Sequence, residues 1–209
     1  QTYFINMQRP SLPVISLVTD KGNFFNADSG IYIQGTNGIY RGGTGDVEAN
    51  WNQDWERKVY VEYYDATGTR QFGVNAGTST MGAISRHTDL KSLNIIMRNE
   101  YEPGYINYPI FGADGNNVYE SFLLRNAGND WERGCFARDA MIQNIVRGQV
   151  DMETQDYQPV VMYLNGEYWS MINMRERYDK RYFSAKYDYV DANDVDILKI
   201  DGDEDCFNR

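Results

Sequence analysis

The sequence predicts an α+β fold in which a mainly antiparallel sheet is combined with one or two helices. Short runs of apolar, aromatic and β-branched residues alternate with turn residues, and tyrosine is frequent, at 17 of 209 residues. Both features favour strands. Asn165-Gly166 lies between two apolar runs and predicts a hairpin, because a type I′ turn needs positive φ at both central residues. Many strands followed by a helix, a hairpin and a second helix are typical of this fold class.

Before residue 129, each apolar run that is bounded by glycine, proline, aspartate or asparagine is predicted to be a strand. These runs are residues 14–19, 31–33, 59–64, 71–74, 92–97 and 121–124. Asp65 to Gly68 is predicted to be a turn. Residues 73–82 are rich in glycine, serine and threonine and are predicted to form a flexible loop.

The main predicted helix covers residues 131–146, with Asn129 or Asp130 as its N-cap and Gly148 just after its end. An N-cap side chain accepts a backbone N–H, and glycine tolerates the positive φ that follows many helices. After the hairpin, residues 178–187 are predicted to form a second, shorter helix and residues 195–200 a last strand.

The hairpin is the predicted centre of the fold. Val160 to Leu164 is continuously apolar, which indicates a strand buried on both faces. Tyr168 and Trp169 are expected in the core. The charged run Arg175-Glu176-Arg177 follows abruptly and is expected at the edge of that core, where it either meets solvent or contacts a ligand.

Composition excludes several classes of protein. Apolar residues make up 42% of the chain, which indicates a globular protein, and no apolar run is long enough to span a membrane. The net charge of −10 argues against a nucleic-acid partner, because binding to a phosphate backbone needs a basic surface. The single histidine, His87, supports neither a histidine-rich metal site nor a catalytic triad.

Residues 13–209 are predicted to form one module, and residues 1–12 are predicted to form a linker or the tail of a preceding domain.

The strongest candidate site is the glycine-, serine- and threonine-rich stretch that precedes Lys91. Proteins often bind phosphate with backbone N–H groups and a nearby lysine. Protein kinases place a glycine-rich loop on two strands and a lysine on the next strand. The predicted order here is strand, loop, strand with lysine, helix and hairpin. An ordinary loop and an ordinary strand lysine are the alternative, because both are common.

Three other patterns are weaker. Residues 41–45 are glycine-rich but lack the lysine of a P-loop, which indicates a surface loop. Residues 201–205 have aspartates at the spacing of a calcium loop, but the position that requires glycine is Cys206. The remaining pattern is a set of tryptophans that either stack on sugars or cap the core: Trp51, Trp55 and Trp131.

Taken together, segments along nearly the whole chain resemble the CotH kinase family, secreted or spore-coat proteins with an atypical protein-kinase fold. The matching segments are Ser85-Arg86, Lys91-Ser92-Leu93, Leu124-Arg125-Asn126, Arg138-Asp139, Leu164 to Trp169 and Met174-Arg175-Glu176. Upstream, Leu12-Pro13-Val14, Gly30-Ile31-Tyr32 and Trp55-Glu56-Arg57 resemble the longer variants of Bacteroidetes-type surface proteins.

The resemblance implies the N-terminal lobe of an ATP-dependent protein kinase. In that lobe Lys91 would contact the nucleotide phosphates, and Gly82, Ser85 and Arg86 would form the loop over them.

The resemblance also assigns roles further along the chain. Met174 and Glu176 would belong to the hinge that meets adenine. The helix would supply the partner of the lysine, either Asp139 or Asp130.

ATP with Mg²⁺ or Mn²⁺ is the implied cofactor, a protein is the implied substrate, and the implied location is secreted or at the cell surface. The family's metal-binding and catalytic acidic residues belong to a C-terminal half that this sequence does not contain. The chain is therefore expected to be a truncated fragment that does not catalyse alone. The alternative is a catalytically silent surface module that binds glycans or a protein partner.

Overall fold

A computed structural model describes residues 2–5, 10–37, 39–40, 47–112, 116–130 and 134–198. The chain divides into two compact units, Gln1–Arg177 and Tyr178–Arg209. The larger unit contains the sheet, and the described part of the smaller one contains a short helix.

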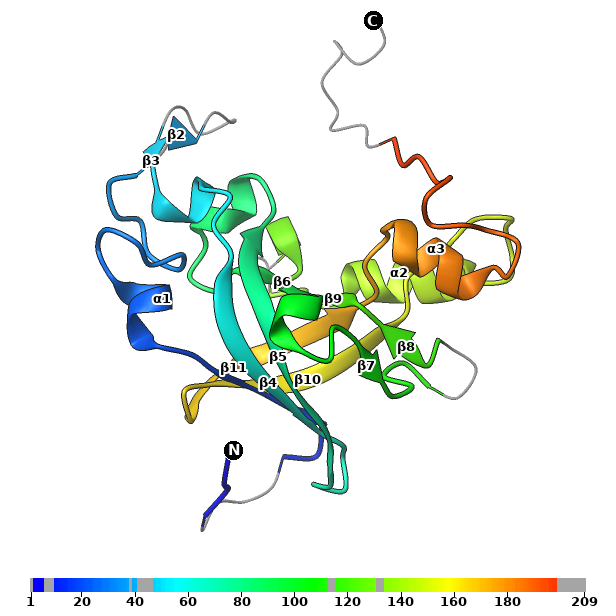
Figure 1. Ribbon diagram of the computed structural model, residues 1–209, viewed down its shortest axis with the longest axis horizontal. Helices are drawn as coiled ribbons and strands as arrows, with labels where there is room; N and C mark the ends of the chain where they lie inside the picture. The colour runs from blue at the N-terminus through cyan, green and yellow to red at the C-terminus, as the bar shows by residue number, and fades with distance from the viewer. Residues whose placement is uncertain are drawn as a thin grey trace, which may run out of the picture. The chain divides into compact units, whose positions relative to one another are not determined.

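Seven strands of the larger unit close into a barrel (Figure 1). They are β1 (Val14–Val18), β4 (Arg57–Tyr64), β5 (Arg70–Met81), β6 (Ser92–Ile96), β9 (Ser121–Arg125), β10 (Tyr157–Leu164) and β11 (Glu167–Arg175). Their order around the barrel is β1-β10-β11-β9-β6-β5-β4. Within this barrel β1 and β10 are parallel and every other neighbouring pair is antiparallel. The predicted α+β fold with a mainly antiparallel sheet is therefore confirmed.

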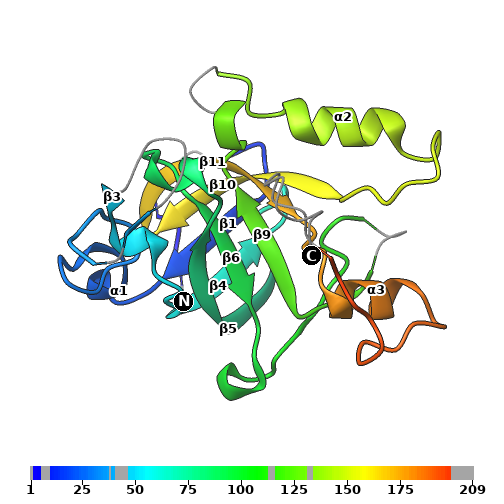
Figure 2. The same ribbon diagram turned by 90° about the horizontal axis from the view of Figure 1, so that it is seen from above.

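Smaller elements surround the barrel. Two short pairs of strands are β2 (Ile39–Tyr40) with β3 (Val47–Glu48), and β7 (Ile106–Asn107) with β8 (Val118–Tyr119). The α-helices among the described residues are α1 (Lys21–Phe25), α2 (Arg138–Val146) and α3 (Lys180–Lys186). Figure 2 shows α1 and α2 at different sides of the barrel. No helix in the described part of the chain is both long and apolar enough to cross a membrane.

β1 closes the barrel because it has a partner on each side. Leu17 lies opposite Val61 of β4 and opposite Leu164 of β10. Ile15 and Leu17 are completely buried, as expected for the inward face of a closed sheet. The interior is filled by alternate apolar side chains from all seven strands.

The hairpin turn is confirmed, since Asn165 and Gly166 have φ values of 51° and 86°. The placement of Tyr168 in the core is wrong, because this side chain is 63% exposed. A β-bulge explains the difference: Met162 lies opposite Ser170, but the next residue of β10 lies opposite Tyr168. The extra residue, Trp169, reverses the alternation of faces. Trp169 packs against the core while partly exposed, and Tyr168 points outward.

The predicted strand at residues 31–33 is wrong, because these residues form a turn. The N–H groups of Ile31 and Tyr32 donate to the carbonyls of Asn23 and Phe24, at 3.0 and 2.9 Å. The backbone is thus tied to α1 rather than to a strand. Both side chains are buried, which accounts for the apolar pattern.

The predicted flexible loop at residues 73–82 is also wrong up to Met81, because β5 continues through it. Its small residues make room for neighbouring side chains. A Cβ on Gly77 would overlap the Glu56 carboxylate, and a Cβ on Gly73 would overlap the Arg70 guanidinium. Glycine inside a strand often marks such a close approach.

The main helix begins later than predicted, at Arg138 instead of residue 131. Gly134 has φ +69°, a left-handed conformation that interrupts a helix. The predicted end is confirmed, since α2 ends at Val146 and Gly148 has positive φ. The second helix is confirmed as α3, whose N-cap Asp179 accepts from the Tyr182 N–H at 2.9 Å.

Some predicted segments differ or lie outside the described residues. Residues 195–198 have no strand, and residues 199–200 lie outside the described part. The glycine-rich residues 41–45, Trp131 and the acidic residues 201–205 also lie outside it.

The predicted linker contacts the barrel where it is described. The Thr2 N–H donates to Glu62 Oε2 at 2.6 Å, and the Tyr64 hydroxyl donates to the Thr2 carbonyl at 3.0 Å. The Phe4 ring lies edge-on to Tyr64, with ring centroids 5.2 Å apart. Whether residues 1–12 belong to a separate domain stays a prediction.

Candidate functional site

The connection from β5 to β6, residues 82–91 (hereafter the 82–91 loop), lies at one end of the barrel and contains four of the predicted site residues. Gly82 has φ +112°, and a Cβ there would overlap Ser85 Oγ. Glycine is therefore required at the first position of the loop. Arg86 Nη1 donates to the Trp51 carbonyl at 3.2 Å, so the loop is joined to a 3₁₀ turn at residues 50–52.

Asn126 holds the loop from the other side. It directly follows β9 and is 1% exposed. Its Nδ2 donates to Thr88 Oγ1 at 3.1 Å and to the Leu90 carbonyl at 2.6 Å, and its Oδ1 accepts from Ser92 Oγ at 2.7 Å. Buried polar groups are expected to be paired in this way. Sequence reasoning noted Asn126 as part of a motif but missed its role, which depends on contacts 34 to 38 residues away.

Lys91 ends the loop and is 3% exposed. Its Nζ donates to the Thr88 carbonyl at 2.8 Å and lies 4.1 Å from the ring centre of Trp51 and 5.3 Å from that of Tyr32. Burial lowers the pKa of the Lys91 ammonium to about 8, and the negative charge of Asp89 acts in the opposite direction. The ammonium is thus enclosed by two aromatic rings and a carbonyl, and contact of Lys91 with phosphate stays a prediction.

A cluster of charges lies on the outer face of the barrel beneath α2. Leu124 and Met174 point into the core, so their neighbours Arg125 and Arg175 point outward. Asp139 of α2 pairs with both, at 2.7 Å to Arg175 Nη1 and 3.2 Å to Arg125 Nε.

Electrostatics keep this cluster ionised. Burial alone would raise the pKa of Asp139, but Arg175, a hydrogen bond from Gln143 and Arg125 together hold it below its ordinary value. Asp139 was a predicted partner of the lysine, but in the structure it pairs with two arginines instead. The other candidate, Asp130, pairs with Arg138 at 2.9 Å.

The charged run after the hairpin was expected either to meet solvent or to contact a ligand. Exposure to solvent is wrong for its first two residues, Arg175 and Glu176. Arg175 is 1% exposed and Glu176 is also buried. Glu176 Oε2 accepts from the Asp156 N–H at 2.8 Å, and its carbonyl accepts from Gln155 Nε2 at 2.8 Å. These bonds tie the end of β11 to the segment before β10.

The predicted hinge residues are therefore held firmly in the fold. Met174 is completely buried and lies between Gln158 of β10 and Leu124 of β9. Their contact with adenine stays a prediction. Among the described residues no three His, Cys, Asp or Glu side chains come together as a metal site.

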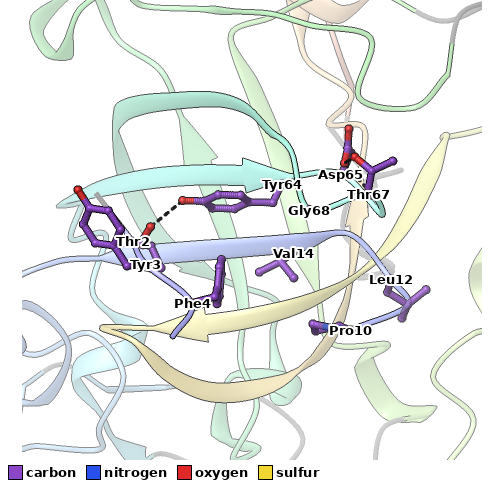
Figure 3. A pocket seen from close by; sticks show the side chains of 10 residues that line it. All are labelled: Thr2, Tyr3, Phe4, Pro10, Leu12, Val14, Tyr64, Asp65, Thr67 and Gly68. Carbon is purple, nitrogen blue, oxygen red and sulfur yellow. Dashed lines mark hydrogen bonds between the residues drawn. The ribbon is translucent and has the colours of Figure 1, made fainter. Parts of the chain in front are cut away.

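A separate pocket of about 390 Å³ lies between the N-terminal segment and the turn that joins β4 to β5 (Figure 3). Apolar side chains and the Tyr64 ring form much of its wall. Polar groups of the turn line another part. Its lining residues are Thr2, Tyr3, Phe4, Pro10, Leu12, Val14, Tyr64, Asp65, Thr67 and Gly68.

Comparison with known proteins adds one positive finding. The family model described as CotH kinase protein matches residues 78–208, which is more than half of the chain. The match includes the 82–91 loop, β9, α2 and the hairpin. No curated protein matches the chain.

Proposed function

The chain belongs to the CotH kinase family, and from this premise we propose that its barrel binds ATP for phosphoryl transfer to a protein. The supporting observation is the ion pair between Arg125 of β9 and Asp139 of α2, since Arg125 precedes Asn126, whose side chain bonds to Thr88 and Leu90 of the 82–91 loop. A binding loop, a strand cation and a helix carboxylate are three parts that protein kinases need in this order.

The order of strands supports the comparison with kinases. In protein kinases a glycine-rich loop covers the phosphates, and the lysine of the next strand pairs with a glutamate of the following helix. Here the 82–91 loop joins the neighbouring strands β5 and β6, and β9 is next to β6 in the barrel. The cation on that next strand is Arg125, whereas Lys91 belongs to the loop.

We therefore assign the phosphate contact to Arg125, with Asp139 holding its guanidinium in position. Gly82, Ser85 and Arg86 form the cover over the phosphates. Glycine adopts the left-handed backbone at position 82 without strain and leaves room for Ser85 Oγ at the start of the loop.

We propose that the hinge lies at the end of β11. The boundary between the two compact units follows Arg177, directly after the predicted hinge residues. Both the N–H and the carbonyl of Glu176 bond to residues 155–156. Met174 and Glu176 thus act by fixing the strand end, and the backbone after them meets adenine.

Mg²⁺ or Mn²⁺ is expected with ATP, because phosphoryl transfer needs a metal to neutralise charge. The described residues do not fit a metal of their own, since no cluster of three ligating side chains occurs among them. The roles assigned to this chain are accordingly limited to nucleotide contacts. The location proposed for the protein is secreted or at the cell surface.

The test is calorimetric titration of ATP with Mg²⁺ or Mn²⁺ into the full-length protein. Loss of a charge-assisted bond to phosphate in Arg125→Met should raise Kd about 10- to 100-fold. Arg98→Met is the matched control, because Arg98 also pairs with a carboxylate, Glu56, at 2.7 Å but lies outside the site. No affinity in the wild-type protein would refute the proposal. An unchanged Kd in Arg125→Met would refute the assignment of the phosphate contact to Arg125.

A second candidate function is binding of glycans without catalysis. The pocket beside the N-terminal segment favours it, because the Phe4 and Tyr64 rings line the pocket together with polar groups of the turn. Stacking on such rings is the usual means of binding sugars. Titration of soluble oligosaccharides into the wild type and Phe4→Ala measures this function independently of ATP.

A further inference from the structure

Three aromatic residues that are far apart in the sequence meet at the base of the 82–91 loop. They are Tyr32 from the turn after α1, Trp51 from the 3₁₀ turn before β4, and Trp169 from the bulge of β11. We refer to these three residues as the aromatic brace. Tyr32 and Trp51 precede residue 78, so they lie outside the part of the chain that the family model matches.

Trp51 contacts the loop with both its backbone and its ring. Its carbonyl accepts from Thr80 Oγ1 at 2.7 Å and from Arg86 Nη1 at 3.2 Å, on the two sides of Gly82. Its ring lies 4.1 Å from Lys91 Nζ, a distance at which a cation is attracted to an aromatic face. One residue therefore holds the strand before the loop, the middle of the loop and its last residue.

Tyr32 holds the last residue of the loop through the main chain. Its hydroxyl accepts from the Lys91 backbone N–H at 2.9 Å and from Trp169 Nε1 at 3.0 Å. The Tyr32 ring is itself fixed, because it stacks on Phe24 with 5.6 Å between centroids and meets Trp169 edge-on at 5.5 Å. A buried hydroxyl with two donors in a rigid setting defines the position of Lys91 closely.

We propose that the aromatic brace positions the 82–91 loop by holding Lys91, so that the loop is ordered before a ligand arrives. Lys91 is then the anchor of the loop rather than its phosphate-binding group. The consequence for nucleotide affinity rests on the proposed function, since ordering a loop in advance lowers the cost of binding. The ordering itself does not depend on that function.

The first measurement is amide hydrogen exchange of the full-length protein without nucleotide. Trp51→Leu removes the ring beneath the ammonium and should speed exchange of the loop amides about three- to thirtyfold. Tyr32→Phe removes the hydroxyl acceptor while keeping the ring, and should speed exchange chiefly at the Lys91 amide. Trp51→Phe keeps an aromatic face, so the loop amides should retain most of their wild-type protection from exchange. Unchanged loop exchange in both Trp51→Leu and Tyr32→Phe would overturn the proposal.

Trp55→Leu is the matched control. Trp55 also lies against a cation, with Arg57 Cζ 4.8 Å from its ring centre, and also packs against the core. Its removal should leave loop exchange unchanged. An equal increase in this variant would mean that loss of any core tryptophan loosens the loop, which would contradict a specific brace.

The second measurement separates the brace from the proposed function. If the wild type binds ATP, Trp51→Leu should raise the Kd and KM for ATP by a similar factor and leave kcat unchanged, because a positioning residue does not touch the reacting atoms. Faster loop exchange with an unchanged Kd would overturn the positioning role. Faster loop exchange in a protein whose wild type binds no ATP would support the brace and refute the nucleotide function.

Discussion

Replacement of Lys91 by methionine tests how the buried ammonium affects stability. The pKa of Lys91 falls from 10.5 to about 8 on folding, chiefly because the side chain is removed from water. A difference of about 2.5 units corresponds to about 3 kcal/mol, at about 1.36 kcal/mol per unit. Folding therefore disfavours the charged form by about this amount below pH 8. Methionine has a similar length and no charge.

The sign of the pH dependence follows from proton binding. Between pH 8 and 10.5 the unfolded lysine binds a proton that the folded lysine has lost, so the wild type becomes more stable as pH rises through this window. The free energy of unfolding of Lys91→Met, relative to that of the wild type, should therefore be highest below pH 8. This difference should fall by about 3 kcal/mol by pH 10.5. Asp89 and Tyr32 face the ammonium, and both are present in each protein.

The assay is urea denaturation of both proteins at a series of pH values from 7 to 10.5. The quantity compared is the difference in free energy of unfolding at each pH. Lys58→Met, which removes an exposed lysine from β4, is the control for the chemistry of the substitution. A difference between wild type and Lys91→Met that does not change with pH would refute the reasoning, because it would mean that folding does not shift the ionisation of Lys91.

Two other substitutions test the site and the bulge. Asp139→Asn should lower the free energy of unfolding at pH 7 by about 1–3 kcal/mol, because it weakens the pairing of the buried Arg175. This loss of stability should vanish at low pH, where Asp139 of the wild type is protonated and its lowered pKa no longer adds stability. Equal destabilisation at pH 3 and pH 7 would contradict this account. Trp169→Ala should lower the free energy of unfolding by about 2–4 kcal/mol, whereas Tyr168→Ala should change it by at most about 0.5 kcal/mol. A larger loss in Tyr168→Ala than in Trp169→Ala, in thermal or urea unfolding, would contradict the position of the bulge.

Much of the local structure could be predicted because its cause is local. The turn at Asn165-Gly166 follows from the positive φ that both residues tolerate, and the end of α2 follows from Gly148. The strands β1, β4 and β6 follow from apolar runs bounded by turn residues. The late start of α2 also has a local cause, the left-handed Gly134, but the N-cap residues Asn129 and Asp130 favour an earlier start.

The candidate site was predictable only in part. Gly82, Ser85, Arg86 and Lys91 followed from the resemblance to the CotH kinase family, and the comparison confirms that family. The glycine-rich loop itself was expected at residues 73–82, where β5 continues to Met81. The pairing of Asp139 with Arg125 and Arg175 was not predictable, and neither was the burial of Arg175. Asp139 is 14 residues from Arg125 and 36 residues from Arg175, and it meets them only when α2 packs on the barrel. Charged residues after a strand usually meet solvent, so their pattern favoured the wrong alternative.

The hairpin shows the division between sequence and structure most clearly. Its turn, its strands and its family motif depend on neighbouring residues, and the sequence by itself determined them. Which face of β11 points inward was decided by the bulge at Trp169, and that choice brought the tryptophan to Tyr32, 137 residues away. The enclosure of Lys91 and the closure of the barrel by β1 are likewise tertiary, because packing between distant segments leaves no periodic signal within either segment.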